Sequence, residues 1–435
     1  MKYNPGKLKA DVGFVKRQLE DHHPALYWYI TKKSLDYKFD SLSKSIKEPL
    51  SFAQFRYKLA CVLADIGDGH MSLLFDQNKL NENDVSKFNG TKVLPLKQLE
   101  YEIIGNKLFI ARSHDPRIKR GMEIVAIDKK PTRDILKVLT RGMPADGYST
   151  HFKYFVLKKS MFSDIYSAYY GYLDTVSLQL DEGGTSSTVT ITSSWESGKF
   201  NDPDPRGRST IEHAIVKNQQ GAPAILRVKA FDKITDHIFS DFFAQLKRDS
   251  IRSLELDLRG NIGGDHSNMI KLFSYLIDKP TYFAEIFNRN KAGKMEDDLD
   301  YGAKTPVQPA ADHFDGVLYI YTNEGTFSAA SLLAGSLQAI KRGTIIGQET
   351  GGGRNGCIGG RFVQFSLPNT SLLLKFGEMQ IKIPIQTDFS GRGVVPDIKT
   401  VYSFKDFIKK EDLEHKWVIG QIWPEAYKRL WPDGK

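Results

Sequence analysis

Ser328 lies where a strand-like run changes into a helical pattern, a position that suits a chemically reactive side chain. Residues 317–321 are β-branched, aromatic and aliphatic, and 323–325 form a polar break. After Ser328, the apolar residues recur at helical spacing, at Ala330, Leu333, Leu337 and Ile340. Unpaired N–H groups at a helix N-terminus stabilise a developing anion, so this position suits a nucleophile. An ordinary serine helix cap explains the same position equally well.

His70 is a second candidate, in a glycine-flanked turn after a predicted helix. Residues 66–70 read IGDGH, and a strand-like run follows over 71–75. An imidazole titrates near neutral pH, and a turn of this kind can project it into a cleft as a general base. Taken alone, His70 also fits an unremarkable surface histidine.

A glycine-rich loop is the third feature. Residues 257–264 read DLRGNIGG at the end of another strand-like run. Glycines let backbone N–H groups approach a ligand closely, so Gly263 or Gly264, together with Ala329, could form an oxyanion hole. A plain turn and a phosphate cradle are the alternatives. The cradle is disfavoured because neither this loop nor 350–353 carries the Lys-Ser/Thr pair of a P-loop.

The remaining pattern predicts a multi-domain α/β protein. Amphipathic helices are expected over 12–19, 35–46 and 52–62, the last capped by Ser51. Short strands are expected at 101–104 and 108–111, joined by a turn at 104–106, and at 176–180 and 188–192. The stretch that begins at 120 reads as a strand, a turn and a helix through 135–139, so this region is predicted to be an α+β middle module. From 209 onward strands and helices alternate, which indicates βα units around a largely parallel sheet, and 403–430 reads as a covering helix. We therefore expect three domains: 1–78, 79–200 and 201–435.

Composition excludes several classes of function. The 435 residues are 40% hydrophobic and 26% charged, and the net charge of +9 is dispersed, which argues against nucleic-acid binding. No apolar run reaches the roughly 20 residues of a membrane helix. Two cysteines, Cys61 and Cys357, do not make a disulfide framework, although a bond between them stays open. His22 and His23 are adjacent, not at ligand spacing, so no metal site is predicted.

Taken together, the motifs resemble those of the C-terminal-processing and tricorn-type serine peptidases. Five stretches match in the family's order, over most of the chain: 68–70, 257–264, 323–329, 347–353 and 393–397. The resemblance implies a crotonase-like βα sandwich as catalytic domain, an N-terminal helical region and a PDZ-like middle module. The stretch 120–131 matches a PDZ domain in part, because Asp128-Lys129 stands where the family has Asn-Gly.

The resemblance also selects a branch of the family. One branch has a lysine base 25 residues after the serine, where this chain has Gly353, followed by a permanently charged Arg354. The tricorn-like branch takes its base from the Asp-Gly-His motif, which implies His70. A serine that helps to orient this base is replaced by Gly69. Asp388 is the candidate acid, with Glu378 and Asp68 as rivals.

The expected activity is hydrolysis of unfolded or short peptides through an acyl-enzyme, without a cofactor. Two alternatives stay open: a relative that binds peptides or apolar ligands without turnover, and an acyl-CoA enzyme that shares the oxyanion-hole geometry. The first residues lack the apolar core of a signal peptide, which fits a cytosolic protein or a chain whose leader is missing. Family habit favours the periplasm or the extracellular space.

Overall fold

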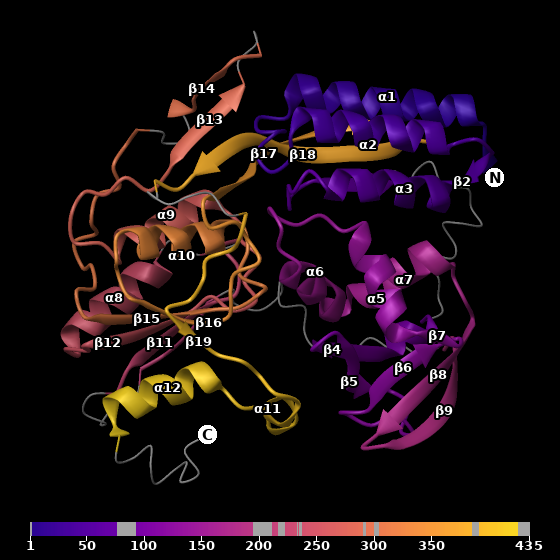
Figure 1. The fold of residues 1–435 in the computed structure, drawn as a ribbon. Coiled ribbons are helices and arrows are strands. Elements are labelled where there is room, and N and C mark those ends of the chain that lie inside the picture. Colours follow the sequence, from indigo (N-terminus) through magenta and orange to yellow (C-terminus); the bar gives the residue numbers. More distant parts are fainter. Residues whose placement is uncertain are drawn as a thin grey trace. The chain divides into compact units, whose positions relative to one another are not determined.

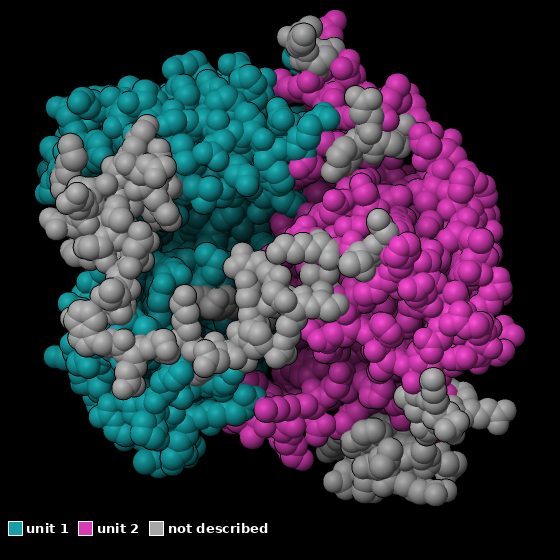
Figure 2. Space-filling view, turned by 180° about the vertical axis from the view of Figure 1, so that it is seen from behind, with its two compact units in different colours: residues 1–202, 291–293, 361–378 teal, residues 203–290, 294–360, 379–435 magenta. Residues whose placement is uncertain are grey.

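The computed structural model describes residues 2–75, 93–194, 211–215, 222–232, 234, 237–289, 293–299, 304–384 and 391–424. The chain divides into two compact units, shown in teal and magenta in Figure 2. Unit 1 comprises residues 1–202, 291–293 and 361–378, and unit 2 comprises 203–290, 294–360 and 379–435. Unit 1 thus contains the described parts of the first two predicted domains. The boundary predicted at 200/201 lies outside the described residues.

Unit 1 begins with three helices, α1 (Pro5–His22), α2 (Lys32–Ser45) and α3 (Phe52–Ala64). Ser51 caps α3 as predicted, and Gln54 completes a capping box. The short strands β1 (Lys2–Tyr3) and β2 (Leu50–Ser51) pair antiparallel, and β3 (Ser72–Phe75) follows the His70 turn.

Two long strands, β17 (Gly356–Ser366) and β18 (Leu372–Lys382), contribute residues to both units. In unit 1, β18 pairs antiparallel with β3, from Leu372 opposite Phe75 to Lys375 opposite Ser72. The side chains that join this hairpin segment to the core of the helices are buried: Leu367, Leu372, Leu374 and Phe376. The core of the N-terminal helices is therefore completed by residues about 300 positions later in the chain.

The rest of unit 1 is the predicted α+β module. Its antiparallel sheet runs in the order β4 (Leu99–Ile104), β5 (Lys107–Ser113), β6 (Glu123–Ile127), β8 (Thr175–Glu182), β9 (Thr185–Thr192), with β7 (Lys130–Pro131) beside β6 and a 3-10 turn, η2 (Pro95–Gln98), before β4. Its helices are α5 (Thr132–Arg141), α6 (His151–Val156) and α7 (Phe162–Tyr170), with a π-helical turn, η3 (Leu157–Met161), between the last two. Gly105 and Asn106 both have positive φ, as the predicted hairpin turn requires.

Unit 2 is built on a sheet ordered β10 (Ile211–Ala214), β11 (Ala224–Val228), β12 (Ser253–Asp257), β15 (Val317–Thr322), β16 (Thr344–Gly347) and β19 (Ile398–Lys399). All neighbouring pairs are parallel except β10 with β11, which confirms the predicted βα arrangement. The helices α8 (Ile238–Arg248), α9 (His266–Ser274) and α10 (Ala329–Ala339) contribute buried side chains to the main core on one face.

The other face of this sheet is covered by α12 (Leu413–Ile422), whose Val418 packs on Tyr321 and Ile346 (Figure 1). The predicted single tail helix is wrong in one respect: α11 (Phe404–Lys409) and α12 are separate, because Lys410 adopts a left-handed conformation. β13 (Glu285–Arg289) pairs with β14 (Met295–Asp297) and with residues 379–382 of β18. No described helix is long and apolar enough to cross a membrane.

Candidate active site

Ser328 occupies the N-cap position of α10 in an unusual backbone conformation. Its φ is 52° and its ψ is −128°, and its side chain makes no capping hydrogen bond. A non-glycine residue held in such a region costs of order 1–3 kcal/mol, which the surrounding structure has to compensate. The simple helix-cap interpretation is therefore disfavoured, since the serine is held in a strained turn and does not cap.

Gly263 and Gly352 both approach Ser328 closely. A Cβ atom added to Gly263 would lie 2.6 Å from the Ser328 Cβ, 3.0 Å from its Oγ and 3.1 Å from the Ala329 nitrogen. A Cβ on Gly352 would lie 3.1 Å from the Ser328 nitrogen and 2.1 Å from the Ser331 Oγ. Any larger side chain at these positions would collide with the strained turn. The glycine loops of the sequence are thus in contact with the predicted nucleophile.

Hydrogen bonds join the loops that follow β12, β15 and β16. The Phe327 N–H donates to the Asn261 carbonyl at 2.9 Å, and the Thr326 hydroxyl donates to the Leu258 carbonyl at 2.9 Å. From the third loop, the Gly352 N–H donates to the Thr326 carbonyl at 3.1 Å. These three strands are parallel neighbours, so their carboxyl ends meet at one edge of the sheet. Open α/β sheets bind ligands at such an edge.

The backbone N–H groups predicted to form an oxyanion hole differ in their surroundings. The Gly263 N–H donates to the Asn261 side-chain oxygen at 2.8 Å, and the Asn261 amide in turn donates to the Val228 carbonyl at 2.9 Å. Gly263 would have to leave Asn261 before it could bind an oxyanion. Gly264 has a φ of 129°. A Cβ atom added to Gly264 would lie 2.8 Å from the backbone nitrogen and from the Oδ1 of Asp232. Ala329 begins α10, and its nitrogen faces Gly263.

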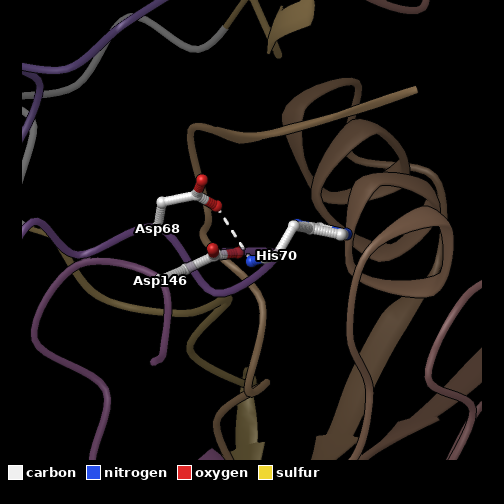
Figure 3. Close-up of side chains that lie close together, drawn as sticks. All are labelled: Asp68, His70 and Asp146. Atoms are coloured by element: carbon white, nitrogen blue, oxygen red, sulfur yellow. Dashed lines mark hydrogen bonds between the residues drawn. The ribbon is translucent and has the colours of Figure 1, made fainter. Parts of the chain in front are cut away.

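The turn that carries His70 is held by two buried carboxylates (Figure 3). The His70 N–H donates to the Asp68 Oδ1 at 2.9 Å, and the Gly69 N–H donates to the Asp146 Oδ1 at 2.8 Å. The Gly147 N–H also donates to the Gly67 carbonyl at 2.8 Å. The rival acid Asp68 therefore orients the backbone of this turn.

His23, which was considered above only as a metal ligand, contacts the Asp68 side chain of this turn. It is fully buried, and its Nδ1 accepts a hydrogen bond from the Ala25 N–H at 3.2 Å. That assigns the proton to Nε2, which lies 3.2 Å from the Asp68 Oδ2. A histidine directly before a proline gives no sequence signal for such a role.

Burial lowers the pKa of His70, because desolvation disfavours the imidazolium. The Asp68 carboxylate opposes this shift and Lys375 reinforces it. The imidazole is therefore neutral at pH 7, as a general base must be. Ligand atoms of Asp68, His70 and Asp146 lie within 4.8 Å of one another, the spacing of a possible metal site, although both carboxylates already hold backbone N–H groups.

The predicted site residues lie in different parts of the structure. His70 belongs to unit 1 and Ser328 to unit 2, so their pairing stays a prediction. Glu378 lies in β18, and Asp388 lies outside the described residues. His266, which no sequence motif singled out, begins α9 two residues after Gly264. Burial lowers its pKa to about 4, although Asp265 opposes the shift.

A partly buried charge network supports the glycine loop. The Arg259 guanidinium donates to Asp257, Asp412 and Glu414, at 2.7 to 2.9 Å. Burial alone would raise the pKa of Asp257, yet its bonds to Arg259 hold that pKa below the usual range. The arginine thus connects the end of β12 to the start of α12. Nothing in the local sequence pairs Arg259 with residues 153 and 155 positions away.

The chain is similar in sequence to known proteins over part of its length. The model of peptidase family S41 matches residues 223–400. A "Probable CtpA-like serine protease" of Staphylococcus epidermidis is 25% identical over 193 residues, which are 44% of this chain and 36% of that protein. A second protein of the same name, from Staphylococcus haemolyticus, is 25% identical over 228 residues, which are 52% of this chain and 42% of that protein. The chain thus spans well under half the length of these curated relatives.

Among solved structures, mature CPAF is similar over nearly the whole fold. Its TM-score is 0.69 at 14% identity, and the match covers 99% of each chain. At this identity the likeness establishes the fold, a mixed α/β architecture with several sheets.

Proposed function

We propose, from the match of residues 223–400 to peptidase family S41, a family of serine-type peptidases, that the chain hydrolyses peptide bonds of unfolded or short peptides. The observation that carries the proposal is the strained Ser328, which makes no capping bond and lies against Gly263 and Gly352. A serine held at positive φ at the start of a helix presents its hydroxyl outward, as acyl transfer requires.

In the proposed mechanism, Ser328 attacks the peptide carbonyl while His70 accepts its proton. The same histidine then protonates the leaving amine. In the second half of the reaction His70 accepts a proton from the water that attacks the acyl-enzyme, and it returns this proton to the Ser328 oxygen. His70 is favoured because its depressed pKa keeps it neutral, and because Gly353 stands where the other branch has a lysine. Asp388 is the proposed acid partner of His70.

Backbone N–H groups of Ala329 and of Gly263 or Gly264 would hold the oxyanion. The loss of one such donor costs roughly 3–4 kcal/mol of transition-state stabilisation in serine peptidases. For Gly263, the donor would become available when its bond to Asn261 opens.

The finer architecture is part of the same proposal. We assign unit 2 to the crotonase-like βα sandwich, residues 93–194 to a PDZ-like module, and the helices α1 to α3 to the N-terminal region that supplies the base. Following the habit of the family, we propose that the protein acts in the periplasm or outside the cell, which fractionation of the source cells would test.

A fluorophosphonate probe tests the nucleophile and the base together. The native chain should be labelled, and both Ser328→Ala and His70→Ala should abolish labelling. His266→Ala is the matched control, because it removes another histidine of lowered pKa and should leave labelling intact. Undiminished labelling of Ser328→Ala would refute the nucleophile. Labelling that survives His70→Ala and disappears in His266→Ala would move the base to His266.

One observation favours a second candidate, a binding protein of the same fold without turnover. The Gly263 N–H is already bonded to Asn261, so the described conformation lacks this oxyanion donor. Saturable binding of an unlabelled peptide by the native chain, with no labelling under any condition, would favour this reading.

A further inference from the structure

A cavity of about 200 Å³ lies in unit 1, between the end of α5 and the start of α6. All six side chains that line it carry hydrogen-bond donors, and none is a carboxylate: Lys137, Thr140, Arg141, Thr150, Lys153 and Tyr154. Three of them are cationic. A concave site of this composition suits an anion with several acceptor oxygens.

The positive charge around this cavity is only partly balanced. Arg141 donates to the Asp65 carboxylate at 2.9 Å, but Lys38 donates to the same carboxylate at 2.7 Å. Within the described part of the chain, no ion pair engages Lys137 or Lys153. Burial and the nearby Arg141 lower the pKa of Lys153, and Asp65 opposes this shift only in part. An anion in the cavity would therefore stabilise the charged form of Lys153.

The walls of the cavity connect directly to the turn that carries His70. Residues 142–150 join α5 to α6, and this loop contains Asp146 and Gly147. Asp146 accepts from the Gly69 N–H, and the Gly147 N–H donates to the Gly67 carbonyl, both at 2.8 Å. Arg141 also reaches the end of α3 through the Cys61 carbonyl at 2.8 Å. An occupant that ties α5 to α6 therefore fixes both ends of the loop that orients His70.

We propose that this cavity binds a small dianionic oxyanion of the phosphate type, and that its occupancy orders loop 142–150 and the His70 turn. The volume accommodates a tetrahedral oxyanion with several waters, since one water occupies about 30 Å³. Three cations favour a dianion over a monocarboxylate. Binding is independent of the proposed peptidase function, and only an effect of the anion on catalysis rests on it.

Calorimetric titration of the full chain with inorganic phosphate tests the binding. Phosphate should bind the native protein, and Lys153→Met, which keeps the side chain's length, should weaken it roughly tenfold or more. Lys119→Met is the matched control, because that lysine pairs with Glu182 on the surface and should leave the affinity unchanged. Sodium chloride at equal ionic strength corrects for general screening.

Equal affinity of the native chain and Lys153→Met would overturn the site, as would the absence of a phosphate effect beyond that of chloride. Acetate binding as strong as phosphate would overturn the dianion assignment. Hydrogen exchange with and without phosphate tests the coupling: residues 66–70 and 142–150 should gain protection, and binding without that gain would refute the link to His70. Ser328→Ala should bind phosphate normally, so a failed peptidase assignment would leave this result intact.

Discussion

At the scale of single residues, the candidate site depends on missing side chains as much as on reactive ones. Ser328 keeps a positive φ because Gly263 and Gly352 leave space beside it and because the loops around it are hydrogen-bonded to one another. Gly263 itself has a φ of 106°, which other residues rarely adopt. The same position thus requires glycine for two separate reasons.

Gly263→Ala should abolish fluorophosphonate labelling, because the new methyl group would lie 2.6 Å from the Ser328 Cβ and displace the serine. Gly183→Ala is the control: Gly183 also has a positive φ, of 63°, but nothing lies within 4 Å of its added Cβ. Labelling rates and thermal unfolding of both variants should be measured. Full labelling of Gly263→Ala would mean that the close approach to Ser328 is not required for reactivity.

The depressed pKa of His70 predicts the acid limb of the pH profile. The base must be neutral, and burial makes protonation harder, so activity should persist as the pH falls through the ordinary value of 6.5. The midpoint of the acid limb of kcat/KM for a peptide substrate should therefore lie below 6.5. Since Lys375 contributes to the depression, Lys375→Met should move the midpoint upward. A native midpoint above 6.5 would exclude His70, with its lowered pKa, as the base.

At the scale of elements, a single buried carboxylate fastens the hairpin segment to the first helix. Asp11 of α1 accepts from the Asn369 N–H, the Asn369 amide, the Thr370 N–H and the Thr370 hydroxyl, at 2.7 to 3.0 Å. Both Asp11 and Thr370 are buried. Four donors around one carboxylate compensate for its loss of solvent.

Asp11→Ala should lower the free energy of unfolding by about 3 kcal/mol, since it leaves buried donors of Thr370 without an acceptor. Asp21→Ala, at an exposed position of the same helix, should change it by less than about 0.5 kcal/mol. Chemical denaturation of the two variants measures the difference. Equal stability would show that the hairpin tip is held by its apolar contacts alone.

At the scale of the whole molecule, the two units are interleaved along the chain. Residues 361–378 belong to unit 1 although they follow more than 150 residues of unit 2. They supply Leu367, Leu372, Leu374 and Phe376 to the core of the helices. A cut at the boundary between 202 and 203 consequently does not separate two complete cores.

A fragment of residues 1–202 should lose the packing of its helices and keep that of the module. Burial of four such side chains contributes about 6–12 kcal/mol, comparable to the whole stability of a domain. The core of the module includes no residue of 361–378. Hydrogen exchange should therefore show protection lost over 2–75 and retained over 93–194, and a fragment fused by a flexible linker to 361–378 should regain it. Native-like protection of 2–75 in the bare fragment would contradict this expectation.

The sequence by itself determined the elements whose signals are local. Helical periodicity and the N-cap Ser51 located α3, the residue types of Gly105 and Asn106 located the turn before β5, and alternating strands and helices indicated the parallel sheet of unit 2. It also selected Ser328, because a change from strand to helix periodicity is visible in a few residues. These features arise from interactions between neighbours in the chain, which the order of residues records directly.

Only the tertiary structure decided the features that depend on distant contacts. The strands β17 and β18 were not predicted, because glycines interrupt the alternation of apolar and polar residues in their sequences. The strands that β18 pairs with, β3 and β13, are also far away in the chain. The same holds for Asp11 with Thr370, Arg259 with Glu414, and His23 with Asp68. The hydrogen bond between Gly263 and Asn261 is local, but it depends on a backbone conformation that the residue types of the loop do not specify. These polar groups are buried or half-buried, and such a group is stable only with a partner that the folded chain brings to it.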